Sequence, residues 1–558
     1  MNRDRAIARI HERAAAGNAW DLVVIGGGAT GLGIAVDASA RGHATLLIER
    51  DDFGSGTSSR STKLLHGGVR YLAQGNVSLV REALRERDIA LANAPHLTRP
   101  IAIAVPGRSH FEKVFYRSGL LLYDRLAGRS SLPASRGLSA SRLRQFVPGL
   151  AERVGDKPFV GGVLYHDGQF EDARLALALA RTAWSAGACV VNHAEVVDLM
   201  RTGAVTGSVG DNGKLAGVVV RDRETGDAIE CLARVIVNAT GPFCDAVRRI
   251  DDHRSEAMIA PSQGVHLVLP DRFLPGATGV IVPHTPDGRV IFALPWRDRV
   301  IVGTTDTPLK TIPREPRPLE SEIAYLLELC GRYLANPPAR SDVLAVFTGV
   351  RPLVRGDGAV ATSRLSRDHS MQVSASGLVT ITGGKWTTYR RMAEETVDLV
   401  ERLAGLGRRA CTTRSLRLHG CPGVTTQEGQ GDAPTREPLA AYENPPDDRL
   451  SLYGTDASII RAIAEESPSM ARPIHPQVVT SAAEVVFAAR EEMARTVEDV
   501  LARRTRDLVV DARVAWAAAP VVAELLATEI GRDAAWVASQ VSSFRAEASA
   551  SMLREMSP

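Results

Sequence analysis

The sequence predicts an α/β fold built from a βαβ unit, an antiparallel sheet and an all-helical C-terminal domain. Residues 21–49 run from an apolar strand, DLVVI, through a glycine turn and an alanine-rich helix to a second strand, ATLLIE. Between residues 264 and 305, Pro, Gly and Asp separate short apolar runs, which is typical of antiparallel strands. After residue 449, apolar residues recur with the 3.6-residue period of amphipathic helices. These three patterns predict the fold class.

The length and composition indicate a folded chain with more than one domain. Its 558 residues exceed the ~250 to 300 that one hydrophobic core usually holds. Hydrophobic residues make up 44% and charged residues 23%, as in ordinary globular proteins. The net charge of +3 gives no sign of a nucleic-acid partner. Six cysteines form no CxxC pair and no metal-ligand spacing, so we expect a reducing cytoplasm and no metal site.

The first twenty residues alternate charge with alanine, which predicts a short amphipathic helix rather than a secretory signal. No run of about 18 uncharged apolar residues occurs along the sequence, so no bilayer-spanning helix is expected. Any contact with a membrane is therefore predicted to be at its surface.

The remaining elements follow in order along the chain. A helical pattern at 172–186 leads into strands, with a hairpin turn at 224–226. Another strand is predicted in GLVTITGG, followed by a helix that ends near residue 405. Residues 421–448 are polar and rich in Pro and Gly, which indicates a linker, and 449–558 form the predicted helical domain.

The first feature that indicates a ligand is the glycine turn. Gly26, Gly28 and Gly31 form GxGxxG between a strand and a helix, where backbone amides can hold a pyrophosphate. Glu49 ends the second strand, where an acid can accept hydrogen bonds from ribose hydroxyls and repel a 2′-phosphate. The alternatives are an ordinary turn and a solvated glutamate. The strand-turn-helix context favours a dinucleotide other than NADP, either NAD or FAD.

A second ligand signal is the polar segment GTSSRSTKLLHGGVRYL, residues 56–72. Its small, hydroxylated and basic residues suit an extended dinucleotide beside a phosphorylated ligand, and they would be costly in a plain core. The predicted cofactor contacts here are Thr57, Ser58, Ser59, Ser61, Lys63, Leu64, His66, Gly67 and Gly68.

Five blocks stand out across about residues 20 to 400. They are SSRSTKLLHGGVRYL (58–72), VNATGPF (237–243), VGTTD (302–306), TGVRPL (348–353) and GGKWTTYRR (383–391). Their joint presence and order resemble the FAD-dependent glycerol-3-phosphate dehydrogenases. The resemblance implies a glutathione-reductase-type FAD fold with an antiparallel substrate sheet above the flavin. It also implies oxidation of sn-glycerol 3-phosphate to dihydroxyacetone phosphate.

The resemblance also implies roles for single residues. It places Ala239 and Gly241 against the adenine half of FAD, and it brings the backbone of Gly383 and Gly384 to the isoalloxazine. The helix that begins near Thr387 and Thr388 would point its N-terminus at N1 and O2 of the ring, and Lys385 joins the cofactor contacts.

The same resemblance implies a domain layout. Residues 1–420 hold the FAD-binding and interleaved substrate-binding domains, with the substrate sheet mainly at about 96–170 and 250–345. The helical C-terminal region fits the family but carries no sharp motif.

A phosphate dianion beside a flavin needs fixed cations, which Arg and Lys supply. Arg351 stands in the apolar stretch VFTGVRPLV, where an unpaired guanidinium would be costly, so an anion is expected there. The alternative for each cation is an ordinary salt bridge. The predicted substrate-binding residues are Arg70, Tyr71, Thr305, Arg351, Arg367 and Lys385.

Transfer of a hydride from C2 of the alcohol needs a base for the hydroxyl proton. His66 in LLHGG, His266 in QGVHLVL and Lys385 are the candidates, and Arg351 completes the predicted catalytic set. A histidine on such a strand can also be only a hydrogen-bonded core residue, so the sequence leaves the base open.

The sequence contains no second GxGxxG and no paired-cysteine redox motif, so reduced flavin needs another acceptor. We expect a membrane quinone, with dioxygen as the alternative. Residues 108–129 mix basic with apolar side chains, which suits an anionic membrane surface, although a core helix with a basic edge would look similar. The basic residues are Arg108, Lys113, Arg117, Arg125 and Arg129, and the apolar ones are Phe111, Phe115, Tyr116, Leu120, Leu121, Leu122 and Tyr123.

We therefore expect a cytoplasmic protein held peripherally on the inner face of the cell membrane, and we allow for a homodimer. Three other functions stay open: a glycerol-3-phosphate oxidase that uses dioxygen, an amine or amino-acid oxidase, and a non-catalytic redox-sensing flavoprotein. An amino-acid oxidase would want an Arg and Tyr pair for a carboxylate rather than a cluster of cations.

Overall fold

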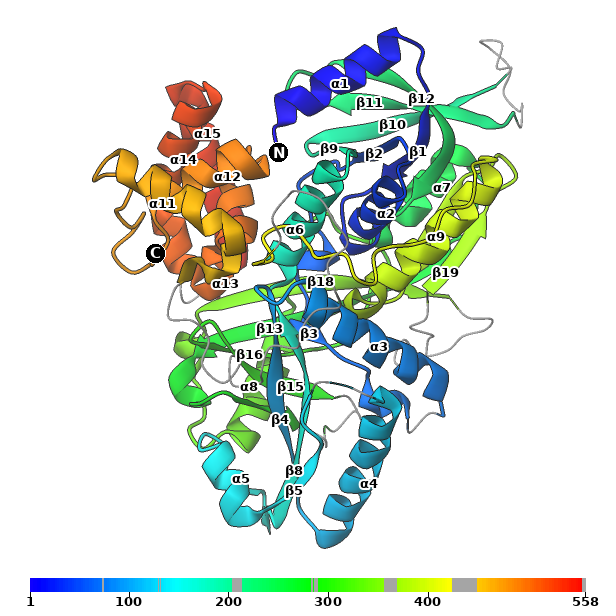
Figure 1. Cartoon of the computed structure of the whole chain (residues 1–558). Helices are drawn as coiled ribbons and strands as arrows, with labels where there is room; N and C mark the ends of the chain where they lie inside the picture. Colours follow the sequence, from blue (N-terminus) through cyan, green and yellow to red (C-terminus); the bar gives the residue numbers. More distant parts are fainter. Residues whose placement is uncertain are drawn as a thin grey trace.

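The computed structural model describes residues 1–72, 75–128, 130, 132–202, 213–282, 285, 290–355, 369–423 and 449–553. Figure 1 shows a sheet with flanking helices at the top, a second sheet below it, and the C-terminal helices beside both. Three regions of the chain thus meet in the middle of the molecule, where the polar segment 56–72 also runs.

The predicted βαβ unit begins the first sheet. Strand β1 (Trp20–Ile25) pairs in parallel with β2 (Thr45–Ile48), and helix α2 (Ala29–Ala40) connects them. These strands are almost wholly apolar because both faces of the sheet are covered. The strand order is β10-β11-β12-β1-β2-β9, and β20 pairs with β12 and β19. The other strands are β9 (Cys189–Val191), β10 (Ala194–Arg201), β11 (Leu215–Asp222), β12 (Ala228–Asn238), β19 (His369–Val373) and β20 (Val379–Gly383).

Helices flank this sheet, and all of them except α7 are predicted from the sequence. The amphipathic N-terminal helix is confirmed as α1 (Arg3–Ala15), capped by Asn2, whose Oδ1 accepts a hydrogen bond from Arg5 N. The predicted hairpin turn is also confirmed, since β11 and β12 pair antiparallel and Gly226 N donates to Asp222 O at 2.8 Å. The other helices are α6 (Asp172–Ser185), α7 (Cys244–Asp251) and α9 (Tyr389–Leu403).

The second sheet is mostly antiparallel, as the short apolar runs predict. Its order is β17-β13-β16-β15-β14-β4-β8-β3, with β18 on β13 and β5 on β8. The strands are β3 (Leu64–Leu65), β4 (Thr98–Gly107), β5 (Arg136–Ser139), β8 (Gly161–Phe170), β13 (Ile259–Pro270), β14 (Thr278–Val282), β15 (Ile291–Trp296), β16 (Arg299–Gly303), β17 (Thr307–Pro308) and β18 (Ala345–Val354). Its helices are α3 (Val77–Asn93), α4 (His110–Ala127), α5 (Ala140–Phe146) and α8 (Glu320–Tyr333).

Helix α4 contains most of the predicted membrane segment, and it has two faces. Leu120 and Tyr123 are 3% and 1% exposed, so the prediction that they belong to the lipid-facing set is wrong. They point inward because α4 packs on the second sheet and on α3. The exposed apolar residues are instead Phe111, Val114, Phe115, Leu121 and Leu122. Arg129 lies outside the described residues.

The C-terminal region is helical, as predicted, and its helices have regular caps. Asp511 and Asp533 cap two of them through hydrogen bonds from backbone amides, and Gly531 ends the longest in a left-handed conformation. The segment Asp499–Arg504, expected as an α-helix, is a π-helix. The helices are α11 (Ala457–Glu466), α12 (Ala482–Glu492), α13 (Asp507–Val510), α14 (Ala512–Ile530) and α15 (Ala534–Ala550).

These helices share a hydrophobic core with the second sheet, in which Val522 and Leu526 belong to the same cluster as Val265 and Val302. The predicted α/β class with a helical C-terminal domain is confirmed. The predicted linker falls largely on residues 424–448, outside the described residues. Within the described ranges, no helix has the length and apolar character needed to cross a bilayer.

Candidate active site

The glycine turn forms a close-fitting cradle at the end of β1. Gly26 has φ +106°, and a Cβ there would lie 2.8 Å from Ala239 O. A Cβ on Gly31 would lie 1.9 Å from Gly26 O, so only glycine lets α2 begin this close to the strand. Gly28 is the N-cap and brings no capping side chain, which leaves the helix N-terminus open to an anion.

Glu49 turns its carboxylate back to the same cradle. Its Oε2 accepts from Gly27 N at 2.6 Å and its Oε1 from Asp51 N at 2.8 Å. Burial raises the pKa of Glu49, although these two backbone hydrogen bonds oppose the shift. A hydrogen-bond acceptor is therefore held at the end of β2, beside the turn, where a ribose of a bound dinucleotide would lie.

Residues 57 and 58 tie the cradle to the second sheet. Ser58 Oγ accepts from Ala29 N at 2.9 Å, and Ser58 O accepts from Trp386 Nε1 at 2.8 Å. Thr57 Oγ1 donates to Val350 O at 2.6 Å, one residue before Arg351. The two hydroxyl residues thus connect α2, the turn before α9 and strand β18.

Ser61 and Lys63, both predicted as cofactor contacts, turn their side chains to Asp172. Ser61 Oγ and Lys63 Nζ donate to Asp172 Oδ2 at 2.8 and 2.7 Å. Burial lowers the pKa of Lys63 to about 8, against the attraction of Asp172. Ser59, which precedes them, is buried, and Leu64 lies in β3. From these residues, cofactor contacts are thus expected mainly through the backbone.

The loop from His66 to Tyr71 meets the segment before α9. His66 N donates to Thr387 Oγ1 at 3.1 Å, and Gly67 N donates to Tyr123 Oη at 2.7 Å. The ammonium of Lys385 lies 4.2 Å from the centre of the Tyr71 ring, a cation–π contact. A Cβ on Gly68 would be 2.5 Å from that ring and 3.5 Å from Lys385 Nζ. The structure thus gathers predicted residues from two sequence blocks more than 300 positions apart.

The remaining predicted cofactor residues lie at the ends of two adjacent strands. Ala239 and Gly241 follow β12, and Gly384 follows β20, which pairs in parallel with β12. Thr387 and Thr388 are buried in the turn that leads into α9. The backbone of Arg70 lies in the short turn 69–71, whereas Arg367 lies outside the described residues.

Arg351 is held by a set of oxygens that the sequence does not reveal. Its Nη2 donates to Thr304 Oγ1 and Thr305 O, both at 2.9 Å, and its Nη1 lies 3.3 Å from Asp306 Oδ1. Asp306 in turn accepts a hydrogen bond from Ser262 Oγ. Asp306 is not among the site residues that the sequence predicts. Its only sequence signal is its place as the last residue of the VGTTD block.

Thr305 binds Arg351 through its backbone carbonyl, while its side chain bonds to other residues. The residue is 1% exposed, and its hydroxyl donates to Glu322 Oε1 at 2.8 Å and accepts from Val265 N at 2.9 Å. The Thr305 side chain, predicted to bind substrate, therefore forms hydrogen bonds within the sheet. The backbone carbonyl of Thr305 accepts a hydrogen bond from the Arg351 guanidinium.

His266 is a buried imidazole beside this arginine. Its Nε2 lies 2.9 Å from Thr62 Oγ1, and its ring stacks on Phe347 with centroids 4.6 Å apart. Burial, and then the positive charges of Lys63 and Arg351, hold the pKa of His266 well below its ordinary value. The ring is therefore neutral near pH 7.

The geometry fits FAD. The glycine cradle and open helix N-terminus suit a pyrophosphate, Glu49 suits a ribose, and the loops at 66–68 and 383–388, predicted to contact the flavin, lie together. A cavity of about 240 Å³ lies elsewhere, between β18, the turn at 57–59 and the C-terminal helices. Its walls include neither Arg351 nor Lys385, so it is separate from the candidate substrate site.

Comparisons with known proteins agree with this geometry. The family model described as FAD dependent oxidoreductase matches residues 21–390, and that of the C-terminal domain of alpha-glycerophosphate oxidase matches 411–537. The chain is 42% identical to the mitochondrial glycerol-3-phosphate dehydrogenase SDP6 of Arabidopsis thaliana, covering 92% of this chain and 84% of that protein. It is 39% identical to the mitochondrial glycerol-3-phosphate dehydrogenase of Homo sapiens, covering 92% and 71%.

A solved structure resembles nearly the whole chain. The glycerol-3-phosphate dehydrogenase from Bacillus halodurans, complexed with FAD, has a TM-score of 0.75 and 28% identity, covering 98% of this chain and 97% of that one. Both domains, the cradle and the sequence blocks thus agree. The chain belongs to the family of FAD-dependent glycerol-3-phosphate dehydrogenases.

Proposed function

We propose that the protein oxidises sn-glycerol 3-phosphate to dihydroxyacetone phosphate and passes the electrons through FAD to a membrane quinone. The names of the relatives support the substrate. The observation that carries the proposal is the fixed guanidinium of Arg351. Its Nη2 donates to the neutral oxygens of Thr304 and Thr305, and its Nη1 lies near the carboxylate of Asp306. A guanidinium oriented in advance in this way is suited to bind a phosphate.

In the proposed reaction, FAD would supply the acceptor for the hydride from C2 of the substrate, and side chains of the protein bind the substrate, orient it and take its proton. Arg351, Lys385 and Arg70 bind the phosphate, while Tyr71 supports Lys385 through its ring. The cations orient the substrate so that C2 faces the flavin, which removes much of the entropic cost of the reaction.

The base that takes the hydroxyl proton is proposed to be His66 or Lys385. The third candidate, His266, has a pKa far below its ordinary value, so it would hold an accepted proton poorly near pH 7. Its neutral ring can still accept a hydrogen bond from Thr62 and support the wall of the site.

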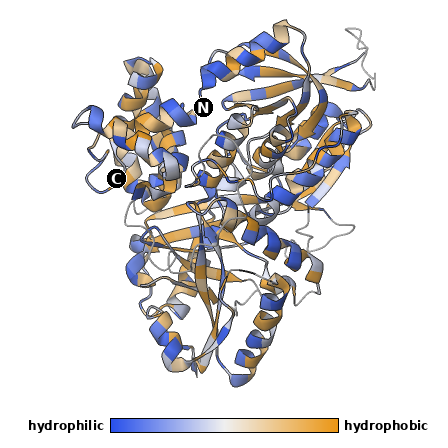
Figure 2. Cartoon of the chain, in the orientation of Figure 1, coloured by the Kyte–Doolittle hydropathy of each residue, from blue (hydrophilic) through white to orange (hydrophobic). Residues whose placement is uncertain are grey.

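The proposed route to quinone begins at the membrane. The exposed residues of α4 recur at positions 111, 114, 115, 121 and 122, which forms one apolar stripe along the helix. Figure 2 shows this helix with hydrophobic and hydrophilic residues mixed, and Arg117 and Arg125 are exposed on it. This pattern supports peripheral binding to an anionic surface, proposed as the inner face of the cell membrane. A homodimer remains a prediction.

The test is anaerobic bleaching of the flavin. Glycerol 3-phosphate should remove the yellow colour of the purified protein, and a quinone analogue should restore it faster than dioxygen does. Protein that stays yellow with the substrate would refute the dehydrogenase. Faster recovery with dioxygen would instead identify an oxidase, the second candidate for this site.

A further inference from the structure

Several contacts join the C-terminal domain to the FAD domain, among them Arg174 with Glu492 and Arg495 with Glu224. One of the contacting segments, residues 499–507, reaches the loop that follows β2 and the 57–63 loop. This segment carries three arginines that are at most 3% exposed: Arg503, Arg504 and Arg506. Two of them bind Asp52, which lies four residues after β2. Arg503 Nε and Arg504 Nη1 both donate to Asp52 Oδ2, and Arg504 Nη2 donates to Asp52 Oδ1 at 3.0 Å. A buried guanidinium is costly unless it is paired, so these contacts are strongly constrained.

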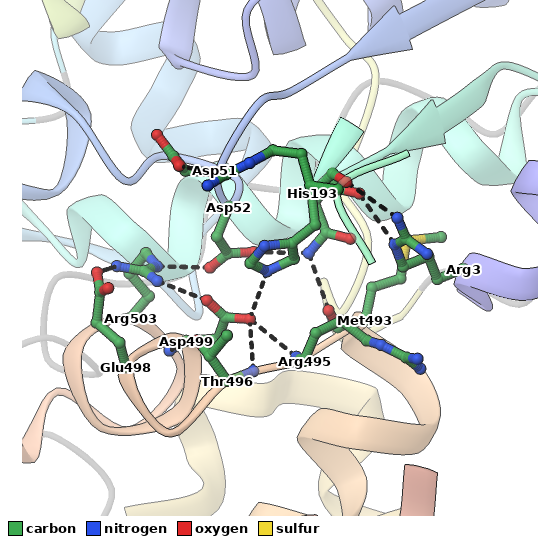
Figure 3. Close-up of polar contacts among 12 residues, drawn as sticks. Arg3, Asp51, Asp52, His193, Met493, Arg495, Thr496, Glu498, Asp499 and Arg503 are labelled. Atoms are coloured by element: carbon green, nitrogen blue, oxygen red, sulfur yellow. Dashed lines mark hydrogen bonds and ion pairs between the residues drawn. The ribbon is translucent and has the colours of Figure 1, made fainter. Parts of the chain in front are cut away.

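Figure 3 shows Asp52, His193, Asp499 and Arg503 as one network of polar contacts. The Asp52, His193 and Asp499 ligand atoms lie close enough together for a metal ion. However, arginines already neutralise both carboxylates, and the His193 ring bonds to Asp499. We interpret this cluster as a set of ion pairs that joins two domains.

Arg506 reaches further, into the flavin side of the molecule. It has φ +71°, a left-handed conformation that a side chain other than glycine rarely adopts. This conformation aims its guanidinium across the domain boundary, where Nη2 donates to Ser59 O at 2.9 Å and lies 3.2 Å from Asp172 Oδ1. Its Nη1 donates to Ala502 O, within the same segment, at 2.8 Å.

Asp172, which Arg506 contacts, also binds the 57–63 loop that is proposed to line the cofactor site. The same carboxylate accepts from Ser61 N, Ser61 Oγ and Lys63 Nζ. Lys63 itself has φ +62°, and its ammonium lies 4.8 Å from the centre of the Phe347 ring, on which His266 stacks. Arg506 therefore contacts both the backbone of the 57–63 loop and the carboxylate that shapes it.

We propose that Arg506 is a positioning residue of the FAD site, through which the C-terminal domain holds the 57–63 loop in the shape that receives the cofactor. The proposal rests on the proposed function only in taking this loop as part of the FAD site. Under this proposal the helical domain contributes to cofactor binding, in addition to packing against the second sheet.

The test exchanges Arg506 for glycine. Glycine adopts the left-handed conformation without strain, so Arg506→Gly removes the guanidinium without harming the backbone. We expect FAD, titrated into apoprotein and followed by flavin fluorescence, to bind about 10- to 100-fold more weakly, because hydrogen bonds from a charged donor are lost. The melting temperature of the apoprotein should fall, because Asp172 and the Ser59 carbonyl lose a buried partner, so FAD is titrated well below that temperature. The control is Arg490→Ala, an exposed arginine whose partners, Glu466 and Glu529, lie in the same domain.

Chemical rescue distinguishes a positioning role from general support. Arg506 and Ser59 border the cavity of about 240 Å³, so a free guanidinium ion can enter the space that the variant leaves. Millimolar guanidinium should restore FAD binding to Arg506→Gly, whereas urea, of the same shape but uncharged, should not. Arg506→Lys should be intermediate, since an ammonium can reach only one of the two partners. It also serves as the test if the glycine variant does not fold.

Two results would overturn the proposal: unchanged FAD affinity in Arg506→Gly, or an equal loss in Arg490→Ala. Equal rescue by urea would also count against it. The FAD titration needs no substrate, so it remains decisive even if glycerol 3-phosphate fails to bleach the wild-type flavin. That separate result would refute the substrate and leave the role of Arg506 to the titration.

Discussion

Arg351 is a half-buried side chain of the second sheet whose guanidinium is held by several oxygens. Its position on β18 faces Ser262 of β13, and the turn after β16 supplies Thr304, Thr305 and Asp306 around the guanidinium. A Cβ on Gly264 would lie 2.4 Å from Arg351 Nη2, so glycine leaves the room that the guanidinium needs. The arginine is therefore held in place before substrate arrives.

We predict that Arg351→Ala raises the KM for glycerol 3-phosphate about 100-fold while FAD stays bound, because a preorganised charge partner of the phosphate is lost. Steady-state kinetics and the flavin spectrum measure the two effects. Arg355→Ala is the matched control, since Arg355 is exposed near the end of the same strand and, among the contacts described, its side chain bonds to Ile259 O. Unchanged kinetics in Arg351→Ala would remove this residue from the substrate site.

At the scale of the element, α4 joins the surface of the molecule to the loop at His66. Its outer face carries the apolar stripe, and on its inner face Tyr123 Oη accepts from Gly67 N and donates to Asp167 at 2.9 Å. Burial raises the pKa of Asp167 to about 6, and Arg87, which bonds to it at 2.8 Å, opposes that shift. One helix thus has an exposed apolar face and an inner face that contacts the loop at His66.

We predict that the two faces can be separated by mutation. Phe111→Ser with Phe115→Ser should release the protein from anionic vesicles in a sedimentation assay but leave turnover with a soluble quinone analogue unchanged. Tyr123→Phe should stay on the vesicles and lose about tenfold in kcat/KM, since Gly67 N loses its buried acceptor. Tyr116→Phe, on the same helix, is the control. Retained vesicle binding by the double variant would contradict a membrane role for α4.

At the scale of the whole molecule, charged pairs join the C-terminal helices to the first sheet. His193, just after β9, donates or accepts at 2.9 Å with Asp499 of the π-helix, and Arg174 of α6 binds Glu492 of α12 at 2.8 Å. Burial alone would lower the pKa of His193, but Asp499 outweighs it and the pKa is raised above 6.5.

This raised pKa predicts a pH dependence of stability. A histidine whose folded pKa exceeds its unfolded value stabilises fully below the unfolded pKa, and the contribution is lost as the pH rises through the folded pKa. We therefore expect the free energy of urea unfolding to fall above pH 6.5, and to fall less in His193→Asn. His253→Asn, at an exposed position, should follow the wild type. Equal slopes in all three proteins would rule out this contribution.

The sequence by itself predicted the βαβ unit, the glycine cradle, the antiparallel sheet and the helical C-terminal domain. These features can be predicted from the sequence because their physical causes are local. Apolar residues alternate with the period of the element, and a GxGxxG turn needs glycine where Gly26 and Gly31 leave no space for a Cβ. The family blocks added the candidate residues, whose roles stay predictions.

Only the tertiary structure decided which charges meet and which face of a helix points inward. Asp306 lies 45 positions from Arg351, and Arg506 lies 447 from the Ser59 carbonyl that it binds. The sequence predicts that Tyr123 lies at a membrane interface, whereas the packing of α4 on the second sheet buries it. Such pairs depend on strand register and domain contact, which no local period encodes. The cost of burying a charge predicts that Arg351 has a partner, and only the fold determines which one.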